Sequence, residues 1–185
     1  MAVRTKSATT APSQLATPTD LKPEGVQAIC NALNPLIADA FALYVKTKNF
    51  HWHVSGSHFR DYHLLFDEQA ESILESVDVM AERVRRIGGT TLRSIGHIGE
   101  LQTIEDDNDE FVPPEQMMER LLADNRHIAD MLRNAIGICE KHGDGATSNR
   151  LEEILDETEK RVWFLYEVGP GAAEISRVRA ERRIA

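Results

Sequence analysis

Apolar residues recur at intervals of three and four along most of the chain, which is the spacing of one face of an α-helix. The pattern first holds from 24 to about 53, where Pro35 predicts either a kink or a fresh helix start. It returns from about 59 to 87, and the glycines at 88–89 are typical of the left-handed cap that ends a helix. These segments predict two long helices joined by a short loop.

Two further helices are predicted in the second half of the chain. One begins at the prolines 113–114 and reaches about 142, and the other runs from about 147 to 168. Residues 90–112 carry only a weak apolar pattern and predict a long connection with one short helix. The expected fold is all-α, a four-helix bundle with a long crossover between its second and third helices. This is the ferritin-like way of closing a bundle.

The segments that flank the bundle differ from it in composition. Residues 1–21 are rich in Ala, Thr, Ser and Pro and are expected to form a flexible tail; the bundle follows at 22–169 and a basic tail at 170–185. The N-terminus lacks the apolar segment of a signal peptide, and no apolar stretch approaches the roughly 20 residues that span a bilayer. We therefore expect a cytoplasmic protein without membrane contact.

The charge balance limits the classes of partner. The chain has 21 Lys and Arg against 30 Asp and Glu, a net charge of −9. A domain this acidic is a poor nucleic-acid binder, because duplex binding relies on Lys and Arg. Contact with DNA would have to come from the tails, which carry Arg4 and Lys6 at one end and Arg177, Arg179, Arg182 and Arg183 at the other. The C-terminal arginines could equally pin their tail to an acidic surface.

Two other groups of side chains have ordinary structural interpretations. Cys30 and Cys139 are too few for a disulfide scaffold and are expected to be buried, inert thiols. The acidic run at 105–110 is expected to be a solvated loop rather than a cation site.

The second predicted helix carries the candidate chemistry. At about 100° per residue, four of its polar side chains fall at roughly 0°, 40°, 60° and 100° around the helix, and so share one face. They are His63, Asp67, Asp78 and Glu82. Imidazole and carboxylate groups together form a ligand set that suits iron, manganese or zinc. The alternative is a set of ordinary surface carboxylates with a chance histidine.

The spacing of these residues predicts that a metal site would be shared between two copies of the chain. Asp67 and Asp78 are eleven residues apart, which is about 16 Å along a helix, whereas metal–ligand bonds are only about 2 Å long. The residue numbers sum to 145 for both 63 with 82 and 67 with 78. Two antiparallel copies of the helix around a two-fold axis therefore bring His63 opposite Glu82 and Asp67 opposite Asp78, at two identical sites.

The sequence around these residues resembles a known family. The segment KNFHWHVSGSHFRDYHLLFDE at 48–68, with DVMAER at 78–83, is similar to the signature of the Dps mini-ferritins, the DNA-protection-during-starvation proteins. The resemblance implies a ferroxidase centre between two subunits, with one subunit contributing three ligands and its two-fold partner two. The residues at the matching positions are His51, His63 and Asp67, and then Asp78 and Glu82.

The resemblance also implies a role for Trp52, which in the family is proposed to take up stray oxidising equivalents beside the centre. The alternative for Trp52 is a plain packing aromatic. His53 lies about 200° around the helix from His51 and is not expected to share its ion.

Assembly and activity are likewise implied by the resemblance. The expected protein is a hollow shell of twelve subunits that oxidises Fe²⁺, with hydrogen peroxide favoured over dioxygen, stores Fe³⁺ mineral and so protects DNA; no organic cofactor is expected. In the family, aspartates near the start of the fourth helix line a pore. Asp144 is available there, whereas Asn149 stands where an acid is often found; the possible substitutes are Glu152, Glu153 and Asp156.

Three other functions compete with this one. The first is a nucleoid-packing DNA-binding protein that acts through basic tails, with iron chemistry secondary. The second is a true ferritin or di-iron oxygenase, which would need Glu-x-x-His pairs inside one bundle, and the chain contains none. The third is a helical bundle that holds no metal.

Overall fold

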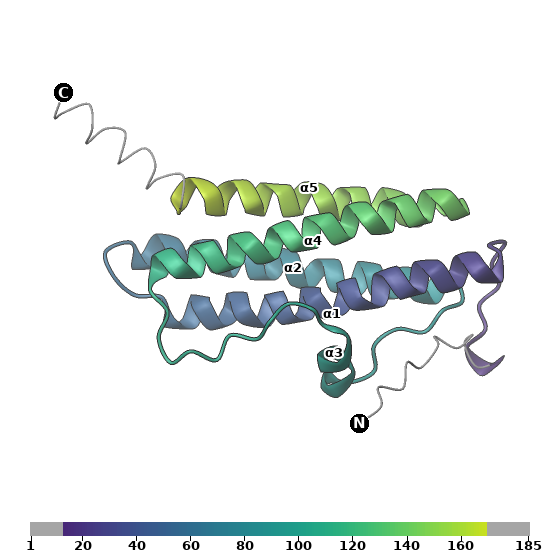
Figure 1. Cartoon of the computed structure of the whole chain (residues 1–185), viewed down its shortest axis with the longest axis horizontal. Helices are drawn as coiled ribbons and strands as arrows, with labels where there is room; N and C mark the ends of the chain where they lie inside the picture. The colour runs from purple at the N-terminus through teal and green to yellow at the C-terminus, as the bar shows by residue number, and fades with distance from the viewer. Residues whose placement is uncertain (1–12, 170–185) are drawn as a thin grey trace.

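The computed structural model describes residues 13–169 and is built from four long helices and one short one (Figure 1). A single 3₁₀ turn precedes them, and no strand occurs among the described residues. The elements in chain order are η1 (Ser13–Leu15), α1 (Pro23–His53), α2 (Phe59–Arg86), α3 (Ile95–Leu101), α4 (Pro114–His142) and α5 (Gly145–Val168). All four long helices and the short helix in the crossover are thus confirmed, with bounds within about two residues of those predicted.

Local sequence sets most of the helix ends. Pro23 and Pro114 stand in the first turns of α1 and α4, where the missing N–H costs nothing. Gly143, at φ 79°, adopts the left-handed conformation that closes α4. Asp144 then begins α5, since its side chain accepts a hydrogen bond from the Thr147 N–H.

Helix α1 continues through Pro35, so the fresh start considered for this position does not occur. Leu33, Leu36 and Ile37 around the proline are completely buried. Burial of such side chains stabilises the fold by about 1.5–3 kcal/mol each, which offsets the cost of about 3 kcal/mol for an interior proline.

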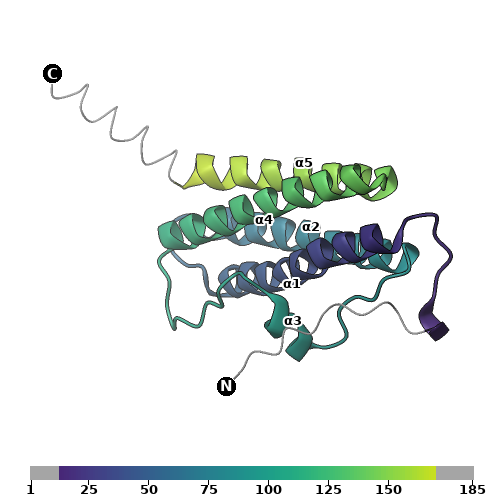
Figure 2. The same ribbon diagram turned by 45° about the vertical axis from the view of Figure 1, so that its right-hand side comes forward.

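The long helices form two antiparallel pairs, α1 with α2 and α4 with α5 (Figures 1 and 2). The crossover from α2 to α4 runs along the outer side of α1, and α3 packs there against α1. Because of this long connection, α4 runs in the same direction as α2. The arrangement is the ferritin-like bundle that the sequence predicts.

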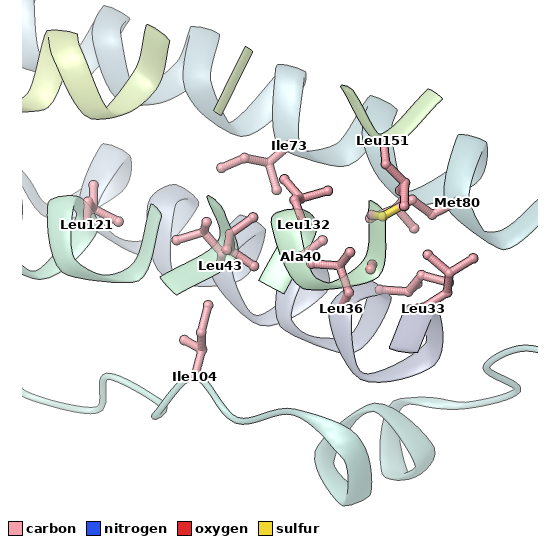
Figure 3. Packing of buried hydrophobic residues seen from close by; sticks show 14 of the residues in the cluster. Leu33, Leu36, Ala40, Leu43, Ile73, Met80, Ile104, Leu121, Leu132 and Leu151 are labelled. Carbon is pink, nitrogen blue, oxygen red and sulfur yellow. The ribbon is translucent and has the colours of Figure 1, made fainter. Parts of the chain in front are cut away.

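The core lies between the helix pairs and extends to the crossover. Figure 3 shows Leu43 and Leu132 facing Ile73 across the bundle, with Ile104 of the crossover on the opposite side of Leu43. All four are buried apolar side chains.

Asp39 fastens the crossover to the bundle. Its completely buried carboxylate accepts hydrogen bonds from the backbone N–H groups of Thr103 at 2.5 Å and Ile104 at 2.8 Å. It also accepts one from the Thr103 hydroxyl at 2.7 Å. The only charged residue in the apolar stretch 26–45 of α1 is therefore fully satisfied by the crossover.

The expectation that no segment is apolar enough for a membrane is wrong for α1. By length and composition alone this helix could cross a bilayer, since Asp39 is the one charge in its apolar stretch. Half of its most apolar window is buried inside the bundle, and a core helix meets the same criteria. The apolar character of α1 is thus accounted for by the core that it forms.

The segment before α1 also contacts the bundle. Arg85 donates a hydrogen bond to the Leu15 carbonyl at 2.8 Å, and Leu21 packs against the core. The tail boundary at 21 stays a prediction, and both 1–12 and 170–185, with the basic C-terminal segment, lie outside the described residues.

Candidate metal centre

His51 and His63 meet at one end of the α1–α2 pair. His51 is in the last turn of α1 and His63 in the second turn of α2, and their rings stack with centroids 3.8 Å apart. The His51 Nδ1 lies 2.7 Å from the His63 carbonyl, and the His63 Nδ1 lies 2.8 Å from the His51 carbonyl. The two histidines therefore hold each other through a reciprocal pair of hydrogen bonds.

These bonds determine which ring nitrogen is free. A carbonyl oxygen can only accept, so in both neutral rings the proton is on Nδ1 and the lone pair is on Nε2. Metal-binding histidines are commonly fixed in this way, with one nitrogen donating to a backbone carbonyl and the other turned to the metal. In His51 and His63, Nε2 is thus the ring nitrogen that could bind a metal ion.

Asp67 lies one turn further along α2, beside the same imidazoles. One of its carboxylate oxygens, Oδ1, is 3.7 Å from the His51 Nε2 and 2.5 Å from the Lys48 ammonium. The hydrogen bond from Lys48 lowers the pKa of Asp67 below its ordinary value, and the nearby imidazoles act in the same direction. Asp67 is therefore an anion at neutral pH.

Asp78 and Glu82 lie towards the other end of α2 and are both exposed. Glu82 forms an ion pair with Arg86 one turn later. Within the described residues, one chain by itself brings together no group of three or more His, Cys, Asp or Glu side chains that could hold a metal ion. The candidate ligands of one chain therefore lie in two separate groups, His51 with His63 and Asp67, and Asp78 with Glu82.

Comparison with known proteins places this chain in a family. The family model for the ferritin-like domain matches residues 30–168. The DNA protection during starvation protein of Halobacterium salinarum is 32% identical over 129 residues, 70% of this chain and 71% of that one. The solved structure of DpsC from Streptomyces coelicolor is 31% identical with a TM-score of 0.79, over 82% of this chain and 88% of that one. The chain belongs to the Dps family of ferritin-like proteins.

A second solved Dps structure adds a chemical class. The Dps protein of Vibrio cholerae O1 is described as a member of a broad superfamily of ferritin-like diiron-carboxylate proteins. It is 25% identical to this chain with a TM-score of 0.77, over 82% of this chain and 96% of that one.

In this Dps-family chain, Trp52 is 62% exposed although it neighbours His51. It does not serve as a packing aromatic within its own chain. His53 is also exposed, and its Nδ1 bonds to the Asn49 carbonyl at 2.8 Å, so it lies apart from the candidate ligands as expected.

Asp144 already has partners within its own chain. It is buried, it caps α5 through Thr147, and it forms an ion pair with Arg83 at 3.1 Å. A carboxylate with these partners is committed to holding the start of α5. Of the substitutes, Glu153 pairs with Arg150, while Glu152 and Asp156 are exposed side chains one turn apart on α5.

The bundle interior contains a buried cation, Arg161. Arg161 is only 5% exposed and donates to Asn125 at 2.9 Å, Ser72 at 3.0 Å and Thr158 at 2.7 Å. Burial lowers the pKa of Arg161 to about 10, so it stays charged at neutral pH. A fixed cation among these neutral partners disfavours a metal ion inside the bundle, which argues against the true-ferritin alternative.

The remaining groups behave as structural residues. Cys30 and Cys139 are free and buried, and burial raises their pKa values to about 11 and about 12. Both are therefore protonated and unreactive at neutral pH, as expected. In the acidic run, Asp107 and Asp109 form ion pairs with Arg120.

Lys48 is the first residue of the segment 48–68 that carries the family resemblance, but no role was predicted for it from the sequence. The available signal is its position one turn before His51, on the same side of α1. Its partner across the helix pair could only be identified in the folded chain.

Proposed function

We propose that this Dps-family protein is a ferroxidase and iron store whose Fe²⁺ substrate binds between two subunits. The observation that carries the proposal is the pair His51 and His63. In both rings Nδ1 is held by a backbone carbonyl, which leaves Nε2 as the nitrogen for a metal ion, and the His51 Nε2 lies 3.7 Å from Asp67. Two imidazoles and a carboxylate form an incomplete first coordination sphere for iron.

The missing ligands are proposed to come from the two-fold partner. In an antiparallel α2 pair, the exposed Asp78 and Glu82 of one subunit complete the half-site of the other. Leu64 and Leu74 lie in the same 100° arc of α2 as the candidate ligands and are each 41% exposed. Exposed leucines beside these ligands support a face that another copy covers.

The proposed reaction transfers one electron from each of two Fe²⁺ ions to hydrogen peroxide. With two protons, the products are two Fe³⁺ ions and two water molecules. Hard carboxylate ligands favour the Fe³⁺ product, so Asp67, Asp78 and Glu82 stabilise the oxidised ion. Because peroxide and Fe²⁺ are consumed together, the reaction also suppresses hydroxyl radicals. Trp52, exposed beside His51, is proposed to take up stray oxidising equivalents.

Assembly into a hollow shell of twelve subunits belongs to the same proposal. Twelve chains of 20.8 kDa give a mass of about 250 kDa. Glu152 and Asp156 are the proposed cation-attracting residues of the pore, since both are exposed, whereas Asp144 is buried in its ion pair with Arg83. A cytoplasmic location fits relatives such as the starvation protein of Halobacterium salinarum.

Radical suppression provides the test. Anaerobic protein is mixed with Fe²⁺ and then peroxide, and hydroxyl radicals are detected by spin trapping. The wild type should suppress the radical signal, and the double variant Asp78→Ala/Glu82→Ala should not. The matched control Glu119→Ala/Asp130→Ala removes two exposed acids of α4 and should behave as the wild type. Equal radical yields with and without the wild-type protein would refute the proposal.

The alternative is a nucleoid DNA-binding protein in which iron chemistry is secondary. This alternative is considered because relatives of the chain are named DNA protection during starvation proteins. The arginines at 177–183 are the candidate contacts with DNA. A gel shift at low and raised salt, with the full chain and with protein trimmed after Gly169, separates the two. DNA binding that is lost on trimming, together with unchanged radical yields in the Asp78→Ala/Glu82→Ala variant, would favour the alternative.

A further inference from the structure

Each half-site already contains a cation of the chain's own. The Lys48 ammonium lies 2.5 Å from Oδ1 of Asp67, and the Arg86 guanidinium pairs with Glu82. The Arg86 pair is a neighbouring-turn contact on an exposed helix surface. The Lys48 pair is different, because it joins α1 to α2 and only 20% of the Lys48 side chain is exposed.

The position of Lys48 conflicts with metal binding. The same oxygen of Asp67 also faces the His51 Nε2 at 3.7 Å, so the ammonium and the imidazole lone pair converge on one atom. A protonated lysine has three donors and no lone pair, so it cannot itself be a ligand. A metal ion that uses this oxygen together with His51 must therefore displace Lys48.

We propose that Lys48 is a built-in counter-cation that neutralises Asp67 in the empty centre and is displaced when a divalent metal ion binds. This inference rests on the proposed shared site. Lys48 is thus a positioning residue that sets the affinity of the centre, through competition for Asp67, rather than a ligand.

The charges of the shared site give the physical reason. Asp67 of one subunit with Asp78 and Glu82 of the other places three negative charges around an empty site, and such carboxylates repel one another. Lys48 and the partner subunit's Arg86 add two positive charges and reduce the total from −3 to −1. A divalent ion that binds takes over the positive charge that the Lys48 ammonium supplied to the empty site. The flexible lysine side chain lets the ammonium, still protonated, move into water.

Lysine competition also favours multivalent ions over monovalent ones. A monovalent cation offers Asp67 no more charge than the ammonium that it would have to displace, whereas Fe²⁺ offers twice as much. The centre is therefore expected to discriminate against Na⁺ and K⁺ in the cell without excluding them sterically.

Calorimetric titration with Zn²⁺ tests the proposal, because Zn²⁺ binds imidazole and carboxylate groups and has no redox chemistry. The full chain is titrated in its native assembly as wild type, Lys48→Met and Lys48→Arg. Removing one partly buried competitor should tighten Zn²⁺ binding by roughly three- to tenfold in Lys48→Met. Lys48→Arg keeps the charge and should remain close to the wild type. Lys160→Met, which removes an exposed lysine paired with Glu157, is the matched control and should leave the affinity unchanged.

The direction of the effect distinguishes this role from a structural one, because local damage would weaken binding. Unchanged or weaker Zn²⁺ binding in Lys48→Met would overturn the inference, provided that Asp67→Asn abolishes binding. If the wild type binds no Zn²⁺, or if Asp67→Asn binds as well as wild type, the proposed shared site fails instead. Should Lys48→Met fail to assemble, assembly restored by Zn²⁺ supports the inference, and failure both with and without Zn²⁺ contradicts it.

Discussion

Asp39 offers a sharp test of how the crossover is held. The variant Asp39→Ala removes a buried acceptor from three donors, the N–H groups of Thr103 and Ile104 and the Thr103 hydroxyl. Asp39→Asn keeps an oxygen for both N–H groups but removes the charge and the second acceptor. Comparing the two variants separates the loss of the hydrogen bonds from the loss of the charge.

The magnitude follows from the burial of each donor. Hydrogen bonds to a charged group contribute about 1.5–3 kcal/mol each, and a buried donor left without a partner costs about 1–3 kcal/mol. Ile104 is buried, whereas Thr103 is exposed and can turn to water. We therefore expect Asp39→Ala to lower the free energy of unfolding by about 3–5 kcal/mol, and Asp39→Asn by about 1–2 kcal/mol.

The assay is urea unfolding followed by the helical circular dichroism signal. All proteins are compared at one protomer concentration, since assembly adds to the apparent stability. Asp130→Ala, at a side chain that is 81% exposed, is the control and should lie within about 0.5 kcal/mol of the wild type. The reasoning is refuted if Asp39→Ala also lies within that range, or if Asp39→Asn costs as much as Asp39→Ala.

Four further predictions concern other buried groups. With pKa values of about 11 and about 12, Cys30 and Cys139 should not react with a thiol reagent at pH 8 until the protein is unfolded. Because these folded pKa values exceed the unfolded value of about 8.5, the stability that the two protonated thiols contribute is fully present below that pH and is lost as the pH rises towards 12. Cys139→Ala should therefore flatten the fall of the unfolding free energy with pH in an alkaline series, and an unchanged slope would contradict this prediction. Gly89→Ala would drive a methyl group into the Cys30 sulfur and should lower the unfolding free energy by about 1–3 kcal/mol, whereas an unchanged melting temperature would show that the site can relax. Arg83→Met leaves the Asp144 carboxylate buried without its cation and should cost about 2–4 kcal/mol in urea unfolding, with Arg83→Lys intermediate; equal stability of all three proteins would exclude the ion pair as a support of α5.

The fold could be predicted almost completely from the sequence, because helices are encoded locally. Apolar spacing, first-turn prolines and the glycine at 143 each act within a few residues, so the four long helices lie where the pattern placed them. Pro35 was the exception, since a proline argues locally for a break. Packing of its apolar neighbours carries α1 through that position, and this packing is a property of the whole bundle.

The candidate site could be predicted only in part. Residue types and spacing on α2 indicate a shared metal centre, and the family resemblance adds His51 from α1. A sequence also does not reveal that Arg83, 61 residues before Asp144, takes up the carboxylate that was available for a pore. Likewise, the role of Lys48 depends on Asp67, which lies on another helix.

The sequence by itself determined the helices and the chemical identity of the candidate ligands. It also predicted that a metal site would need a second chain, since 1.5 Å per residue fixes how far apart two positions on one helix must lie. The tertiary structure decided which charges meet. In the folded chain Asp39 accepts hydrogen bonds from the crossover, and Arg161 lies among neutral partners in the bundle centre. The two stacked histidines are left with their Nε2 atoms free. These outcomes depend on side chains from different helices coming within about 3 Å, and hydrogen-bond energies fall so steeply with distance that only the folded chain specifies them.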